Sequence, residues 1–190
     1  MNAKTKMIAG LGLFTAIVAV LQLAGVAIKL GMFSITLTLA PIIVGAALYG
    51  LGAGAWLGFV FGVAVLISGD AAAFLAINPV GTVAVVLLKG TLAGLAAGAV
   101  YKALEQKSKL GAVITAGITA PVVNTGIFVL GCYLFFMPLI NQWAAGAGAE
   151  NAGLFVLTGV VGLNFVVELA VNLVLSSVIV RIIKLLIKEK

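Results

Sequence analysis

Long apolar stretches alternate along the chain with short segments that carry most of the charges, glycines and prolines. The longer stretches reach the roughly 20 residues that a helix needs to cross the hydrocarbon core of a bilayer. We expect helices because lipid offers no hydrogen-bond partner to unpaired backbone groups. The pattern predicts six spans, at residues 7–28, 35–49, 53–68, 80–101, 111–137 and 154–181, with a tight glycine-rich turn, "YGLGAGA", between the second and the third.

The composition supports a membrane protein. Hydrophobic residues make up 64% of the 190-residue chain and charged residues only 8%, whereas soluble domains carry about 25% charged residues. A chain of this length cannot bury so much apolar surface in one core, so the remainder must face lipid. The sequence therefore predicts an all-α membrane protein, a single domain over residues 1–190 that forms a bundle of six transmembrane helices.

Nine of the eleven cationic residues fall into three groups, and six spans place all three groups on the same side of the membrane, with Lys29 on the opposite side and Lys89 inside a span. Loops rich in lysine and arginine stay in the cytoplasm, so both termini are predicted to be cytoplasmic. The groups are Lys4 and Lys6 before the first span, Lys102, Lys107 and Lys109 between the fourth and fifth spans, and Arg181, Lys184, Lys188 and Lys190 after the sixth span.

Small residues recur every four positions in several spans. This spacing lets helix backbones approach closely in a membrane. It fits either packing inside the bundle or a face that docks onto another membrane protein. The repeats are Gly54, Gly58 and Gly62 in the third span, Gly90, Gly94 and Gly98 in the fourth span, and the shorter pair Gly12 and Ala16 in the first span.

The motifs of several enzyme classes are absent from the sequence. There is no phosphate-binding loop G-x-x-x-x-G-K-[ST], no H-E-x-x-H and no G-x-S-x-G. The chain has no histidine, the commonest metal ligand, and a single cysteine, Cys132. We therefore expect no enzyme, no metal site, no cofactor and no nucleic-acid partner.

Four polar residues lie deep in the predicted spans. Lys89 follows Pro79 by ten residues, which places it roughly 15 Å into the membrane at the rise of an α-helix. Asn124 lies midway along the fifth span, and Asn164 and Glu168 lie one turn apart in the sixth span. Ionisable groups at this depth face the bundle interior or a wet cavity and usually have a partner.

These residues admit more than one interpretation. Lys89 and Glu168 form a buried ion pair with the asparagines as contacts between helices, or they line a ligand cavity in which Lys89 binds an anion. The two interpretations coexist if Glu168 orients Lys89 until a carboxylate arrives. A rival hypothesis is a self-sufficient small carrier or channel that moves protons or ions through Lys89 and Glu168. The outer loops add binding residues at the rim, namely Phe33, Phe74 and Asn78.

The chain resembles the substrate-binding S-components of energy-coupling factor (ECF) vitamin transporters over nearly its whole length. The resemblance rests on the six spans, on "ITLTLAPIIVGAALYGLGAGAWLGFVFGVAVLIS" and "NPVGTVAVVLLKGTLAGLAAGAVYK", and on an N-x-x-x-E in the sixth span. It implies that the protein binds one vitamin outside a prokaryotic cell and releases it inward. It also implies a complex in the plasma membrane with a transmembrane coupling subunit and two ATPases, which supply the ATP hydrolysis.

The same resemblance implies a docking face on the first span. The family's docking motif there is a pair of alanines four residues apart. Gly12 and Ala16 occupy the matching positions, so this chain departs from the motif at the first of them. Glycine at this position should still permit close approach of a partner helix.

The residues favour one class of substrate within that family. Lys89 and its neighbouring amides favour a ligand that bears a carboxylate, and the small number of aromatic residues deep in the spans disfavours a large flat ring. Pantothenate is the first expectation, with lipoate and biotin as related small carboxylates. Riboflavin and folate remain open at this point.

Overall fold

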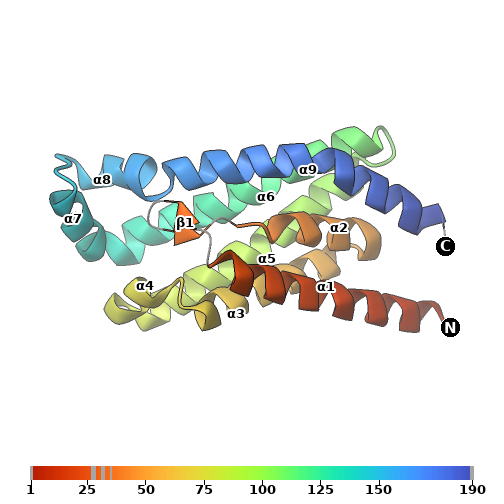
Figure 1. The fold of residues 1–190 in the computed structure, drawn as a ribbon, viewed down its shortest axis with the longest axis horizontal. Helices are drawn as coiled ribbons and strands as arrows, with labels where there is room; N and C mark the ends of the chain where they lie inside the picture. Colours follow the sequence, from red (N-terminus) through yellow and green to blue (C-terminus); the bar gives the residue numbers. More distant parts are fainter. Residues whose placement is uncertain (1, 27–28, 31–32, 35, 189–190) are drawn as a thin grey trace.

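The computed structural model describes residues 2–26, 29–30, 33–34 and 36–188, which form a helical bundle elongated along one axis (Figure 1). Two two-residue strands, β1 (Lys29–Leu30) and β2 (Phe33–Ser34), pair antiparallel after the first helix. Two π-helical segments, η1 (Cys132–Phe136) and η2 (Val156–Val160), interrupt the later helices. The α-helices are α1 (Ala3–Gly25), α2 (Leu39–Tyr49), α3 (Leu51–Ser68), α4 (Ala72–Ile77), α5 (Pro79–Leu104), α6 (Lys109–Gly131), α7 (Met137–Gly146), α8 (Ala152–Phe155) and α9 (Gly162–Lys188).

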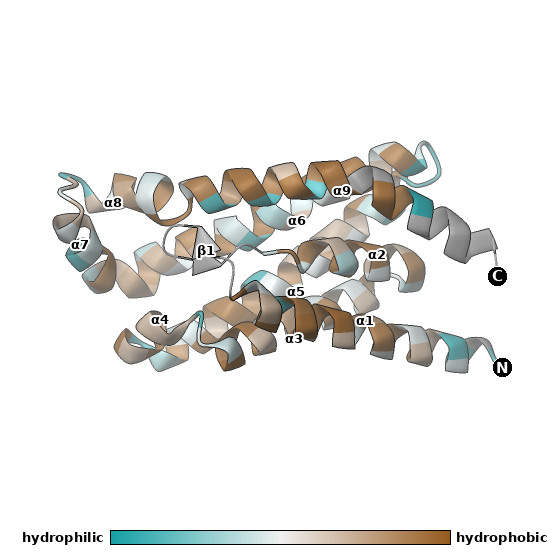
Figure 2. Cartoon of the chain, in the orientation of Figure 1, coloured by the Kyte–Doolittle hydropathy of each residue, from teal (hydrophilic) through white to brown (hydrophobic). Residues whose placement is uncertain are grey.

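Five helical stretches in the described part of the chain are long and apolar enough to cross a membrane, judged by length and composition. The shorter helix α2, with 11 residues, is apolar as well, and apolar residues cover most of the helices in Figure 2. These stretches follow the order of the predicted spans and confirm an all-α membrane bundle. The five long stretches are Lys4–Gly25, Leu51–Ser68, Pro79–Leu104, Lys109–Gly146 and Ala152–Arg181.

The second span differs from the prediction at its start. The apolar pattern begins at residue 35, which lies outside the described residues, whereas α2 begins at Leu39. Pro41 fits into the first turn of α2 because an N–H there has no helical acceptor to lose. The predicted tight turn is confirmed at Gly50, whose φ of 90° favours glycine and which joins α2 directly to α3.

The fifth span is longer than the sequence indicates. The predicted span ends at residue 137, but helical structure continues from Lys109 to Gly146. The π-helical segment η1 ends at Phe136, two residues before Pro138. Proline lacks an N–H and its ring collides with the carbonyl four residues earlier, and a π turn is a common way for a helix to accommodate such a break. The first part of the expected outer loop is therefore the helix α7.

The two glycine repeats of α3 and α5 pack against each other inside the bundle. A Cβ atom added at Gly54 would collide with the backbone carbonyl of Gly94, and one added at Gly58 would collide with that of Gly90. Gly62 approaches the backbone of α5 at Val86 in the same way. Contact between backbones at this range requires residues without side chains. Internal packing is therefore what the structure shows for these repeats.

Both ends of the chain lie at the same end of the bundle (Figure 1). The connection between α5 and α6 lies there too, whereas α4, α7 and α8 lie at the opposite end. The cations around Lys6, Lys107 and Arg181 therefore share one end, as an even number of spans requires. That this end faces the cytoplasm stays a prediction from the distribution of positive charge.

Cysteine labelling tests that orientation. A cysteine at Gly146, which is exposed at the end of α7, is expected to react with a membrane-impermeant maleimide on intact cells. A cysteine at Gln106, exposed between α5 and α6, should react only after the membrane is opened. The native Cys132 is fully buried, so its background labelling is low. The reverse labelling pattern would contradict cytoplasmic termini.

Candidate functional site

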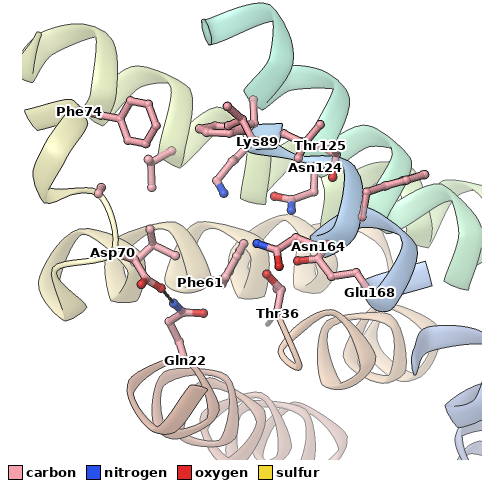
Figure 3. Close-up of a pocket in the computed structure, with 17 residues that line it drawn as sticks. Gln22, Thr36, Phe61, Asp70, Phe74, Lys89, Asn124, Thr125, Asn164 and Glu168 are labelled. Carbon is pink, nitrogen blue, oxygen red and sulfur yellow. Dashed lines mark hydrogen bonds between the residues drawn. The ribbon is translucent and has the colours of Figure 1, made fainter. Parts of the chain in front are cut away.

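A cavity of about 90 Å³ lies among α3, α5, α6 and α9, with α1, α4 and the segment before α2 contributing to its lining (Figure 3). This volume has room for several waters or for part of a small molecule. Ligand pockets are mostly apolar, with a few polar groups that fix the ligand's orientation. Here the polar lining residues are Gln22, Thr36, Asp70, Lys89, Asn124, Thr125, Asn164 and Glu168, and the aromatic ones are Phe61, Phe74, Phe128 and Phe165.

Lys89 projects its ammonium group into this cavity from the middle of α5 (Figure 3). Its Nζ lies 5.5 Å from the centroid of the Phe61 ring on α3 and 5.3 Å from that of the Phe128 ring on α6. An ammonium over an aromatic face gains about 0.5–2 kcal/mol from the electron-rich ring. The two rings therefore stabilise the charged amine at this position, and the amine presents its N–H donors to the cavity.

Two carboxylates flank Lys89 in the same cavity. Figure 3 shows Asp70 on one side of the amine and Glu168 on the other. Asp70 Oδ2 accepts a hydrogen bond of 3.0 Å from Gln22 Nε2 on α1. No direct ion pair joins Lys89 to Glu168 in the described structure, and Glu168 Oε2 lacks a hydrogen-bond partner there. Lys89 and Glu168 thus line a shared cavity without direct contact between their charged groups.

The predicted deep polar residues come together in this cavity. Asn124 on α6 is 4% exposed, Glu168 on α9 is 5% exposed, and Asn164 lies one turn before Glu168. Asn124 Oδ1 and Asn164 Oδ1, like Glu168 Oε2, are buried without a hydrogen-bond partner among the described residues. A buried polar group left unpaired costs about 1–3 kcal/mol. The cavity therefore presents a cationic donor, amide groups and several acceptor oxygens without a partner, which suits binding of a small polar molecule.

Of the three residues predicted at the rim of the site, one lines the cavity, one caps a helix and one has a side chain outside the described part of the chain. Phe74 on α4 lines the cavity and is 3% exposed. It packs on Phe128 and Trp143, with ring centroids 5.4 Å and 5.5 Å away. Asn78 caps α5 through a hydrogen bond of 2.8 Å from Gly81 N to Asn78 Oδ1, and it is not among the lining residues. The backbone of Phe33 belongs to β2, but its side chain lies outside the described part of the chain.

Several residues that line the cavity were not predicted from the sequence. Gln22 carries a signal, since it is the amide of an otherwise apolar span, and polar groups in spans are functional by default. Asp70, in the connection between α3 and α4, also reaches the cavity. Phe61 and Phe128 carry no signal, because phenylalanine is ordinary in an apolar helix. The expectation of few deep aromatic residues is corrected here, since four phenylalanines line the cavity.

Gly12 and Ala16, the predicted docking pair, lie on the face of α1 opposite to the buried residues of that helix. Gly12 and Ala16 are exposed, and a Cβ added at Gly12 would meet nothing within 4 Å. Val20, 63% exposed, continues this face, whereas Val18 and Gln22 are buried against the bundle. The exposed face defined by Gly12, Ala16 and Val20, called the α1 face below, is thus apolar and lined by small residues at one end.

The described residues contain no group of three or more His, Cys, Asp or Glu side chains that could hold a metal ion.

Comparison with known proteins identifies a family. The family model described as "ECF transporter, substrate-specific component" matches residues 6–180, which is nearly the whole chain. Nothing matches among the curated proteins or among the solved structures.

Proposed function

Since the chain belongs to the substrate-specific components of ECF transporters, we propose that it binds a small micronutrient in the cavity around Lys89 and delivers it through an ECF complex. The family consists of substrate-binding subunits, and the helices make this member a multi-pass membrane protein. The observation that carries the proposal is a mid-helix lysine that points into a cavity lined by amides and carboxylates. Ionisable groups inside membrane spans are rare and commonly line substrate or ion pathways.

The substrate in this proposal is a small carboxylate vitamin, with pantothenate as the first choice. Lys89 would neutralise the carboxylate, and charge-assisted hydrogen bonds are roughly twice as strong as neutral ones. The valine and phenylalanine side chains of the lining would contact the ligand's apolar part. The aromatic lining also keeps riboflavin and folate among the compounds to be screened.

The partners in this proposal are a transmembrane coupling subunit and two ATPases in a prokaryotic plasma membrane. The chain has no phosphate-binding loop of its own, so ATP hydrolysis would take place in the ATPases. The α1 face is the proposed contact with the coupling subunit, since Gly12 and Ala16 allow a partner helix to approach closely.

Co-purification and mass spectrometry test this function together. The protein, expressed in its native host and purified in mild detergent, should bring down a coupling subunit and two ATPases and retain a carboxylate vitamin. Liposomes that contain this chain alone should accumulate no labelled pantothenate, whereas liposomes with the whole complex and internal ATP should. Uptake by the chain alone would instead support the rival self-sufficient carrier.

Replacing Lys89 by methionine is expected to weaken pantothenate binding by about 10- to 100-fold, the loss of one charge-assisted hydrogen bond of roughly 1.5–3 kcal/mol. Methionine keeps an unbranched apolar side chain against Phe61 and Phe128 without the charge. Isothermal titration calorimetry in detergent measures the effect. Lys102→Met, an exposed change near the end of the same helix, is the matched control and should leave the affinity unchanged.

A double variant separates the two roles of Lys89. If Lys89 only neutralises Glu168, then Lys89→Met combined with Glu168→Gln should restore both stability and normal affinity, because no buried charge is left unpaired. Normal affinity in this double variant would contradict a role for Lys89 as the ligand's counter-charge.

A further inference from the structure

Three acceptor oxygens gather in one part of the cavity, away from Asp70. They are Asn124 Oδ1 on α6 and Asn164 Oδ1 and Glu168 Oε2 on α9, and each is buried without a hydrogen-bond partner among the described residues. Figure 3 shows the three side chains next to one another at the side of the cavity where Thr36 also lies. We call Asn124, Asn164 and Glu168 the acceptor corner.

Asn172 offers a comparison within the same helix, outside the cavity. Asn172 lies one turn beyond Glu168, is 1% exposed and does not line the cavity. Its Nδ2 donates a hydrogen bond of 2.8 Å to the backbone oxygen of Glu168. The Nδ2 group of Asn172 is thus used within its own helix, whereas the side chains of Asn164 and Glu168 line the cavity.

The Glu168 carboxylate accepts hydrogen bonds from Thr36, but its Oε2 and the two amide oxygens have no partner, and their burial costs free energy unless a ligand supplies donors. Nearly all buried polar groups in proteins are hydrogen-bonded, so a group that is not needs a specific explanation. A carboxylate accepts hydrogen bonds only, whereas each asparagine has an acceptor oxygen and an Nδ2 donor, and here the oxygens are the atoms without a partner. The ligand group complementary to these three oxygens is therefore a hydroxyl or an amide N–H, and a carboxylate placed against Glu168 Oε2 would be repelled.

We infer that the acceptor corner recognises hydroxyl or amide N–H donors of the transported molecule, which carries its carboxylate at the other end, beside Lys89. This inference rests on the proposed function and narrows its substrate class to carboxylates that also bear donors. Pantothenate, with two hydroxyls and an amide N–H, and biotin, with two ureido N–H groups, meet the requirement. Lipoate has a carboxylate but no such donor.

A panel of ligands tests the substrate class. Pantothenate, biotin and lipoate are titrated separately into the purified full-length protein by calorimetry. We expect pantothenate or biotin to bind about 10- to 100-fold more tightly than lipoate, since a buried acceptor left unpaired weakens binding by that factor. Lipoate binding as tightly as the better of the other two would overturn the inference but leave the carboxylate class intact. Failure of all three to bind would overturn both, whereas family membership is tested separately by co-purification.

A pair of matched variants tests the role of the residues without relying on which ligand wins. Asn164→Leu removes an unpaired buried acceptor, so the thermal unfolding midpoint of the ligand-free protein should stay equal or rise, while affinity for the best ligand of the panel falls by about 10- to 100-fold. Asn172→Leu removes a hydrogen bond that is made within α9, so the midpoint should fall while affinity stays unchanged. A lowered midpoint with normal affinity in Asn164→Leu would show that Asn164 is structural and overturn the inference.

Discussion

A tryptophan in place of Ala16 is expected to abolish ATP-driven uptake while leaving ligand binding unchanged. Ala16 is exposed on α1 and contributes to the α1 face, whereas the cavity lies on the inner side of the bundle. An indole at this position would hold a partner helix several ångströms away from a surface that small residues make flat. Uptake of labelled vitamin into liposomes containing the whole complex measures transport, and calorimetry on the isolated subunit measures binding.

The control adds the same bulk elsewhere. Ala170 on α9 is also exposed, so Ala170→Trp should leave both uptake and binding near normal. Uptake at the normal rate by Ala16→Trp would exclude the α1 face as the contact with the coupling subunit. Loss of uptake in both variants would show that any added bulk impairs transport.

Replacing Gly58 by valine is expected to prevent the protein from folding into a stable monodisperse species. A Cβ at Gly58 already collides with the backbone of Gly90, and Thr91 Cα lies within 3.1 Å of it. Overpacking of flexible side chains costs typically about 1–3 kcal/mol, but a backbone cannot rotate away. The helices α3 and α5 would have to separate, which also breaks the contacts of Gly54 and Gly62.

The matched control lies in the same helix. A Cβ at Gly52 would meet nothing within 4 Å, so Gly52→Val should fold with an unchanged or higher thermal midpoint, since glycine is a poor helix former. Gel filtration and thermal unfolding in detergent compare the two variants. A Gly58→Val protein as stable as the Gly52→Val protein would contradict the close backbone contact between α3 and α5.

The architecture was predictable where it depends on local composition. The apolar stretches and the turn at Gly50 follow directly from residue types and their spacing. The end of the fifth span was not predictable in the same way, because residues 138–146 mix polar and small side chains and still form the helix α7. The π-helical segment before Pro138 lets the helix pass a proline that would ordinarily end it.

The cavity was predictable only in part. Lys89, Asn124, Asn164 and Glu168 stand out because polar residues are rare in apolar spans, and the fold brings them together. Which of them contact one another depends on how the helices are rotated, and a single sequence does not specify that rotation. The phenylalanines around Lys89 could not be predicted for the same reason, since every span has apolar side chains on all its faces and the helix rotation decides which of them face the cavity.

The hydrogen bond between Gln22 and Asp70 has a thermodynamic consequence. Gln22 lies on the same helix as Ala16, less than two turns further along, and it also lines the cavity. If the coupling subunit docks on the α1 face, any shift of α1 displaces a wall of the binding site. Free energies around a closed cycle sum to zero, so docking and ligand binding must then change each other's affinity by the same factor. A tenfold weaker hold on the vitamin in the complex would mean that the empty subunit docks tenfold more tightly than the loaded one.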